Sequence, residues 1–146
     1  MLDFPRNAQT STTEYEPCHV DFVRSYIAYP ALDDDAVRQA AELINAAKKP
    51  MALVGQGVEL GNAQEELADF LEKADIPAAR TLLGLSALPS NHPLNVGMLG
   101  MHGNYAPNMK ELECDVLIAI GMRFSERVTG ELSGYAKQGE NHTPRH

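Results

Sequence analysis

A chain of 146 residues is long enough for one domain of ordinary size and short for two independent ones. Its hydrophobic fraction of 44% can form a buried core, which excludes a disordered or collagen-like protein. The 20 Asp and Glu residues outnumber the 12 Lys and Arg residues, and the net charge of −8 argues against nucleic acid and anionic membranes as partners.

The sequence also argues against a membrane protein and against a disulfide-stabilised one. Its longest apolar runs, such as 116–120, are far shorter than the ~20 residues of a membrane-spanning helix, and the first residues resemble no signal peptide. Cys18 and Cys114 lie far apart and form no Cys-x-x-Cys motif, so we expect two ordinary reduced cysteines. These features favour a soluble, cytoplasmic protein.

Residues 1–32 show neither helical nor strand periodicity over a useful length and contain three prolines among scattered aromatic residues. We interpret them as an extended arm, either a linker from a preceding domain or a segment wrapped over the core. The start has the character of a cut made within a longer chain.

Helices and short apolar strands are predicted to alternate from Asp33 onward. A helix begins at the acidic run 33–35, ends near Lys48-Lys49, and is followed by an apolar strand at 51–54. Asn62 and Glu65 have the spacing of a capping box and predict the start of a second helix, which a strand at 76–81 follows.

The second half is predicted to be less regular. Residues 82–103 are interpreted as irregular because of their glycines and prolines, and a short helix is expected at 105–112. The clearest strand, 116–120, precedes a loop at 122–130 and a weak segment around Tyr135. This order predicts a three-layer α/β/α fold with a parallel, Rossmann-like sheet, whose ligands bind at the carboxyl ends of the strands.

Three groups of residues at the predicted strand ends could carry function. The glycines at 55, 57 and 61 suit either a ligand-binding turn or an ordinary tight turn. The segment 97–103 suits either a flat, largely apolar ligand or a packed irregular loop. Arg123 and Arg127 suit either an anionic ligand or a surface ion pair with Glu126.

The remaining patterns indicate neither a metal site nor a nucleophile. His142 and His146 are the one histidine pair with a spacing of four, and Pro144 between them disfavours a helical ligand pair. No Gly-x-Ser-x-Gly motif is present. Reasoning from the residues alone therefore ends at an α/β domain with a nucleotide-like ligand.

A set of ordered motifs closely resembles the central domain of acetolactate synthase catalytic subunits, a thiamine diphosphate-dependent family. The resemblance extends from Asp3 to about Gln138, and the start is similar to the segment that ends the family's N-terminal pyrimidine-binding domain. The motifs are Lys48-Lys49-Pro50, Gly55-Gln56-Gly57-Val58, Ile76-Pro77, Thr81-Leu82-Leu83-Gly84-Leu85, His92-Pro93, Met98-Leu99-Gly100-Met101-His102-Gly103 and the run Gly121 to Gly130.

The resemblance implies three parts of the chain and a function. Residues 1–32 would be the linker from a missing N-terminal domain, 33–138 the FAD-binding central domain, and 139–146 a divergent tail that an expression vector could have contributed. The full-length enzyme would condense two pyruvates, or pyruvate and 2-oxobutyrate, with decarboxylation, for branched-chain amino acid synthesis. Thiamine diphosphate and Mg²⁺ would bind outside this chain, which would be inactive alone and contain no catalytic residue.

The resemblance also implies binding residues and partners. FAD would be held structurally, without net redox change, and Arg127 would contact the carboxylate of the second 2-oxo acid. The parent would be a homodimer or homotetramer with a small regulatory subunit. The residues implied to contact FAD are Gly55, Gln56, Gly57, Thr81, Leu82, Leu99, Gly100, Met101, His102, Gly121, Met122, Arg123 and Val128.

Two departures and two alternatives accompany this interpretation. The family commonly has Asp-Asp where this chain has Ser125-Glu126, and the residues after Gln138 do not resemble the family's next strand. One alternative is the central domain of another thiamine diphosphate enzyme, such as glyoxylate carboligase or pyruvate oxidase. The other is a free-standing nucleotide-binding module.

Overall fold

The computed structural model describes residues 3, 5–16 and 31–130, and the chain divides into the units Met1–Asp33 and Asp34–His146. The first unit contains helix α1 (Arg6–Thr10), whose first two carbonyls accept hydrogen bonds from the hydroxyls of residues near its end. Ser11 Oγ donates to Asn7 O at 2.6 Å, and Thr10 Oγ1 donates to Arg6 O at 3.1 Å. The arm predicted to be extended is therefore helical over these five residues.

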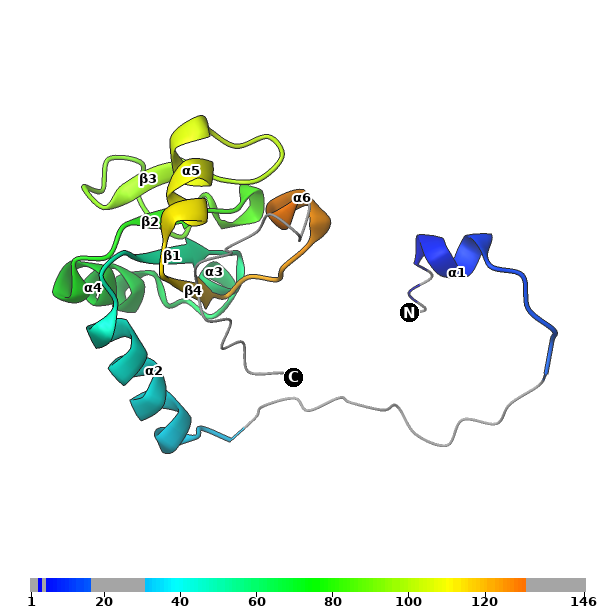
Figure 1. Cartoon of the computed structure of the whole chain (residues 1–146), viewed down its shortest axis with the longest axis horizontal. Coiled ribbons are helices and arrows are strands. Elements are labelled where there is room, and N and C mark those ends of the chain that lie inside the picture. Colours follow the sequence, from blue (N-terminus) through cyan, green and yellow to red (C-terminus); the bar gives the residue numbers. More distant parts are fainter. Residues whose placement is uncertain (1–2, 4, 17–30, 131–146) are drawn as a thin grey trace. The chain divides into compact units, whose positions relative to one another are not determined.

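The second unit is built on a four-stranded sheet in the order β3-β2-β1-β4, in which every neighbouring pair is parallel (Figure 1). The strands are β1 (Pro50–Val54), β2 (Ala78–Arg80), β3 (Asn95–Met98) and β4 (Val116–Ile120). The predicted α/β class and the parallel sheet are confirmed, and β4 has the predicted bounds.

Alternate residues of β1 point into two separate core clusters, because successive side chains of a strand lie on opposite faces. Ala52 and Val54 belong to one cluster together with Leu71 of helix α4 (Gln64–Ala74). Met51 and Leu53 belong to the other, together with Cys114, which directly follows helix α5 (Tyr105–Glu113). Helices α4 and α5 therefore cover opposite faces of the sheet, as Figure 1 shows, which gives three layers.

The first helix of this unit, α2 (Asp34–Ala46), agrees with its prediction at the start but not at the end. Asp34 and Asp35 occupy its first turn, where carboxylates stabilise the positive end of the helix dipole. Ile44 packs against the core cluster of α4. The helix ends at Ala46, so Lys48 and Lys49 lie beyond it, in the turn that leads into β1.

The capping box predicted for α4 is wrong. Asn62 has a positive φ of 52°, and the N-cap is Ala63, which makes no side-chain hydrogen bond to the helix. Asn tolerates the left-handed conformation better than most residues, and here it turns the chain between two helices. The first of these is α3 (Gly57–Leu60), one turn that begins after Gly55 and Gln56, which follow β1.

The segment predicted to be irregular contains a strand, β3, and a 3₁₀ helix, Leu82–Gly84. β3 has only four residues, Asn-Val-Gly-Met, which is too short and too mixed for a clear period. Its pairing with β2 is also shifted by an irregularity between Ala78 and Ala79. The predicted loop 122–130 contains one helical turn, α6 (Glu126–Thr129). The weak segment around Tyr135 and the tail 139–146 lie outside the described residues.

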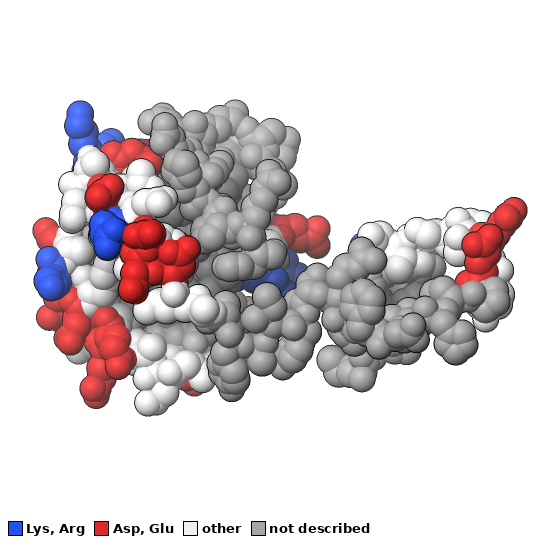
Figure 2. All heavy atoms as spheres, turned by 90° about the horizontal axis from the view of Figure 1, so that it is seen from below, with Lys and Arg blue, Asp and Glu red and all other residues white. Residues whose placement is uncertain are grey.

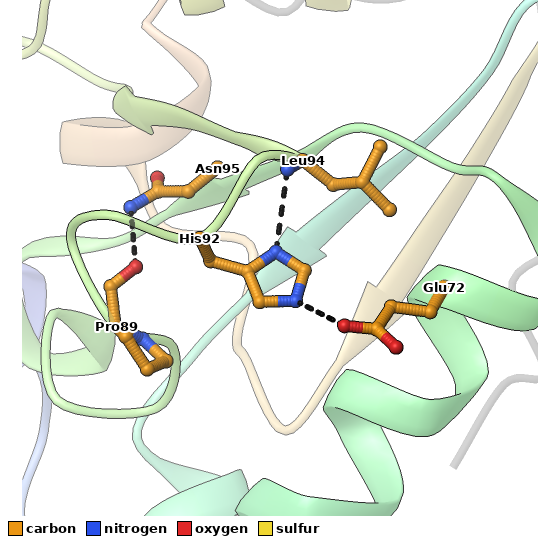
Figure 3. Close-up of polar contacts among 5 residues, drawn as sticks. All are labelled: Glu72, Pro89, His92, Leu94 and Asn95. Carbon is orange, nitrogen blue, oxygen red and sulfur yellow. Dashed lines mark hydrogen bonds and ion pairs between the residues drawn. The ribbon is translucent and has the colours of Figure 1, made fainter.

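The segment that leads into β3 is held by polar contacts around His92 (Figure 3). Leu94 N donates to His92 Nδ1 at 3.3 Å, and His92 Nε2 faces Glu72 Oε1 of α4 at 3.4 Å. Asn95 Nδ2 donates to Pro89 O at 3.0 Å. These bonds fix the turn before β3 without regular secondary structure.

The turn between α2 and β1 is held by Asp115. Its Oδ2 accepts a hydrogen bond from Lys48 N at 2.7 Å, and its Oδ1 accepts one from Lys49 N at 2.9 Å. The hydrogen bond from the Lys48 amide holds the pKa of Asp115 below its usual range, and that from Lys49 adds to this effect. The charged form of Asp115 therefore stabilises the folded chain.

This pKa shift predicts a pH-dependent effect of Asp115→Asn. A lowered pKa in the folded state gives stability that is fully present above the unfolded value of about 3.9 and is lost as pH falls through the folded pKa. We expect Asp115→Asn to lower the urea midpoint at pH 7 and the difference from the parent chain to shrink below about pH 4. Asp69→Asn, at an exposed position of α4, is the control. A difference that is constant with pH would contradict the assignment.

Candidate functional site

The carboxyl ends of all four strands lie at one edge of the sheet, because the strands are parallel. The loops that leave this edge are 55–57 after β1, 81–82 after β2, 99–102 after β3 and 121–123 after β4. Every binding residue implied by the resemblance lies in one of these loops or on α6, which follows the β4 loop. We call this region the carboxyl edge.

The loops after β1 and β4 contact each other through glycine backbone. Gly57 N donates to Gly121 O at 2.7 Å, and a Cβ atom on Gly57 would lie 2.7 Å from Gly121 Cα. A Cβ atom on Gly55 would lie 2.5 Å from Met122 Cβ. Close packing between the two loops therefore explains these glycines. Gln56, between them, is exposed.

The loop after β3 is fixed by the side chain of Asn108, on α5. Gly100 N donates to Asn108 Oδ1 at 2.9 Å, and Asn108 Nδ2 donates back to Gly100 O at 3.2 Å. Met101 N donates to Arg127 O at 2.9 Å, which joins this loop to α6. The loops after β3 and β4 therefore form one connected structure.

The predicted residues differ widely in exposure. The Leu99 side chain is 3% exposed and packs in the core cluster of Met51, so only its backbone can face a ligand. Leu82 and Met101 are 63% and 68% exposed. Exposed apolar side chains thus follow β2 and β3, where a flat apolar group could lie against them.

The charged and polar groups of the carboxyl edge are accessible as well. His102, Arg123 and Arg127 are exposed, whereas Thr81 is buried. Within the described ranges, neither arginine forms an ion pair, so the predicted alternative of a pair between Arg127 and Glu126 is not seen. Elsewhere, Figure 2 shows acidic side chains spread over the described part of the face that it presents.

Sequence reasoning missed two residues that shape this edge, Arg80 and Asn108. Arg80 ends β2 and is 7% exposed, with Nη1 donating to Leu85 O and to Leu88 O, both at 2.8 Å. A charged residue at the end of an apolar strand was the available signal for Arg80. Nothing in the local sequence distinguishes Asn108 from an ordinary exposed helix residue.

The described residues contain neither a metal-binding cluster nor a membrane-spanning helix. No group of three or more His, Cys, Asp or Glu side chains in this part of the chain is arranged to hold a metal ion. None of its helices is both long and apolar enough to cross a membrane.

A hollow of about 340 Å³ lies at the opposite edge of the sheet, next to the amino ends of β1, β2 and β4. Its lining mixes three lysines with two carboxylates, so it presents no single sign of charge to a ligand. The charged residues are Lys48, Lys49, Lys110, Asp75 and Glu113.

Cys114 lines this hollow but is 2% exposed, and its Sγ donates to Glu111 O at 3.0 Å. Burial raises the pKa of its thiol from 9.0 to about 11, and the charges of Glu111 and Asp115 add to the effect. Cys114 is free and buried, as is usual for an ordinary cysteine, while Cys18 lies outside the described residues.

We expect Cys114 to react slowly with thiol reagents. In a Cys18→Ser background at pH 8, the rise in pKa from 9.0 to about 11 lowers the thiolate fraction about 100-fold. Modification by 5,5′-dithiobis(2-nitrobenzoate) should be at least that much slower in the native chain than in the chain unfolded in about 8 M urea. Equal rates would show that the thiol is accessible.

Comparison with known proteins identifies the domain family to which the chain is similar. Residues 37–142 match the family model described as thiamine pyrophosphate enzyme, central domain. The acetolactate synthase isozyme 2 large subunit of Escherichia coli is 40% identical over 136 residues, which cover 93% of this chain and 24% of that protein.

Two further relatives show the same relation. The probable acetolactate synthase large subunit of Methanocaldococcus jannaschii is 38% identical over 95% of this chain and 24% of its own length. The one from Methanococcus aeolicus is 46% identical over 68% of this chain and 17% of its own length. The chain thus spans about a quarter or less of the curated relatives it matches.

Proposed function

The chain belongs to the thiamine pyrophosphate enzyme central-domain family, and from this membership we propose that it is the central domain of an acetolactate synthase large subunit. We propose residues 33–138 as the domain itself, 1–32 as the linker from an N-terminal domain, and 139–146 as a divergent tail. The matches to acetolactate synthases favour this enzyme over glyoxylate carboligase and pyruvate oxidase.

The observation that carries the proposal is the convergence of four loops at the carboxyl edge, in a chain that matches this family. We propose that the edge holds FAD. Exposed Leu82 and Met101 suit the flat ring system, and the exposed guanidinium of Arg123 suits the diphosphate.

The proposed contacts divide by what each residue offers. Gln56 and His102 can offer side-chain polar atoms, whereas the buried Gly55 and Leu99 can offer only backbone. The remaining proposed contacts are Gly57, Thr81, Gly100, Gly121, Met122 and Val128. Because Met101 N is bonded to Arg127 O, the ring-facing loop and the helix of Arg127 would hold each other in place.

In this proposal FAD supplies a rigid ring that completes the fold of the site, with no net redox change. The residues of this chain bind and orient: Arg127, exposed on α6, would hold the carboxylate of the second 2-oxo acid through its planar guanidinium. Thiamine diphosphate and Mg²⁺ would bind in other domains of the parent, so this chain alone would form no acetolactate.

The full-length parent would condense two pyruvates, or pyruvate and 2-oxobutyrate, with loss of carbon dioxide. We propose a cytoplasmic homodimer or homotetramer that binds a small regulatory subunit. The relatives are named large subunits, which supports a partner of this kind.

Titration of the 146-residue chain with FAD, followed by flavin fluorescence and equilibrium dialysis, tests the proposal. We expect saturable one-to-one binding and no acetolactate from pyruvate, thiamine diphosphate and Mg²⁺. Leu82→Glu should weaken FAD binding about tenfold by placing a charge against the ring. Val37→Glu makes a similar change at an exposed position of α2 and should leave binding unchanged.

Two outcomes would contradict the proposal. Equal effects of the two substitutions on FAD binding would place the flavin away from the carboxyl edge. Formation of acetolactate by the isolated chain would show that it contains catalytic groups of its own.

A further inference from the structure

Arg80 is a buried cation that the proposed function does not use. It is the last residue of β2, which lies between β3 and β1, so its backbone ends at the middle of the carboxyl edge. Its side chain is 7% exposed, and Nη1 donates to Leu85 O and Leu88 O at 2.8 Å each. Both carbonyls belong to the segment that follows Thr81, so this segment holds the guanidinium in place.

The charge of Arg80 is not balanced within the described residues. No carboxylate in this part of the chain lies within ion-pair distance of the guanidinium, and its Nε is buried without a hydrogen-bond partner. A buried charge normally has a paired counter-charge, because its removal from water is costly. The two carbonyl oxygens compensate only through their dipoles.

The position of this charge is distinctive in an acidic chain. A protein with a net charge of −8 repels anions in general. Yet three of the five arginines in the described residues, Arg80, Arg123 and Arg127, lie at the carboxyl edge. Arg80 differs from the other two in being buried, where water and salt screen a charge least.

We propose that Arg80 is a positioning residue for an anionic ligand: its buried positive charge attracts a diphosphate group to the carboxyl edge without contacting it. This inference rests on the proposed FAD site and names the part of the ligand on which Arg80 acts. The Leu85 and Leu88 carbonyls hold the guanidinium in place, and because Arg80 is buried, its charge would act on the ligand through space.

The test compares ligands that differ in charge. Dissociation constants of FAD, of uncharged riboflavin and of inorganic pyrophosphate are measured for the 146-residue chain and for Arg80→Gln and Arg80→Lys. We expect Arg80→Gln to weaken FAD and pyrophosphate about tenfold and riboflavin less than about twofold. Arg80→Lys keeps the charge and should stay within about threefold of the parent for all three ligands.

Arg38→Gln is the matched control, because it removes the same charge from an exposed position on α2, where Arg38 pairs with Asp35 at 2.8 Å. It should change none of the three constants. Unchanged binding in Arg80→Gln, or an equal loss for FAD and riboflavin, would overturn the proposal, the latter because it marks a purely structural residue. If Arg80→Gln does not fold, Arg80→Lys decides: a fall of about fivefold or more in its FAD-to-riboflavin affinity ratio overturns the proposal.

Pyrophosphate separates this inference from the proposed function. Binding of pyrophosphate that depends on Arg80, without binding of FAD, would contradict the FAD site and keep the anion site. Binding of FAD that does not depend on Arg80 would contradict the anion site alone. A chain that binds neither would contradict both.

Discussion

Replacing Gly121 with alanine is expected to lower the free energy of unfolding by about 3 kcal/mol or more. Gly121 has a φ of +59°, where a Cβ atom is strained, and that atom would lie 2.6 Å from Val58 N. The backbone around Gly57 would have to move to make room. Urea unfolding followed by circular dichroism measures the loss.

Gly130→Ala separates backbone strain from the steric clash. Gly130 has the same φ of +59°, but no described atom lies within 4 Å of the position that its Cβ would occupy. Its ψ of −132° is also outside the left-handed helical region, so we expect this control to cost about 1–3 kcal/mol from strain alone and less than Gly121→Ala. Similar losses for the two variants would mean that the contact between the β1 and β4 loops is looser than these distances indicate.

Sequence reasoning placed correctly those elements that their own residues are enough to identify. The apolar run Val116–Ile120 is rich in β-branched residues and pairs with β1 along its whole length, although its residues are half-buried and Ala119 is exposed. The strand Asn95–Met98 could not be found in this way, because it mixes Asn, Gly and two apolar residues and owes its conformation to pairing with β2. Tertiary pairing, and not local propensity, determines it.

The general position of the candidate site could be predicted, but the role of each residue could not. Parallel strands bring their carboxyl ends to one edge, so the loops at 55–57 and 121–123 were expected at the same edge of the sheet. That Gly55 packs against Met122, and that Leu99 is buried, depends on distances between loops that no spacing rule encodes. The hydrogen bonds of the Asn108 amide with the N–H and the C=O of Gly100 could not be predicted from spacing either.

Leu53→Ala tests whether the core beneath the carboxyl edge supports it. Leu53 is 0% exposed in the central strand β1 and shares its core cluster with Leu99, which begins the loop after β3. A cavity here should lower the free energy of unfolding by about 3 kcal/mol. It should also speed hydrogen exchange at the Gly100 and Met101 amides, whose bonds to Asn108 and Arg127 depend on Leu99 staying in place.

The control for Leu53→Ala is Leu60→Ala on α3, because the side chain of Leu60 is 77% exposed and its removal leaves no cavity. We expect that variant to stay within about 0.5 kcal/mol of the parent chain. If Leu53→Ala lowers stability while exchange at Gly100 and Met101 keeps the rate of the parent, the Asn108 and Arg127 bonds alone hold the loop. The burial of Leu99 would then contribute to the stability of the domain and not to the shape of the carboxyl edge.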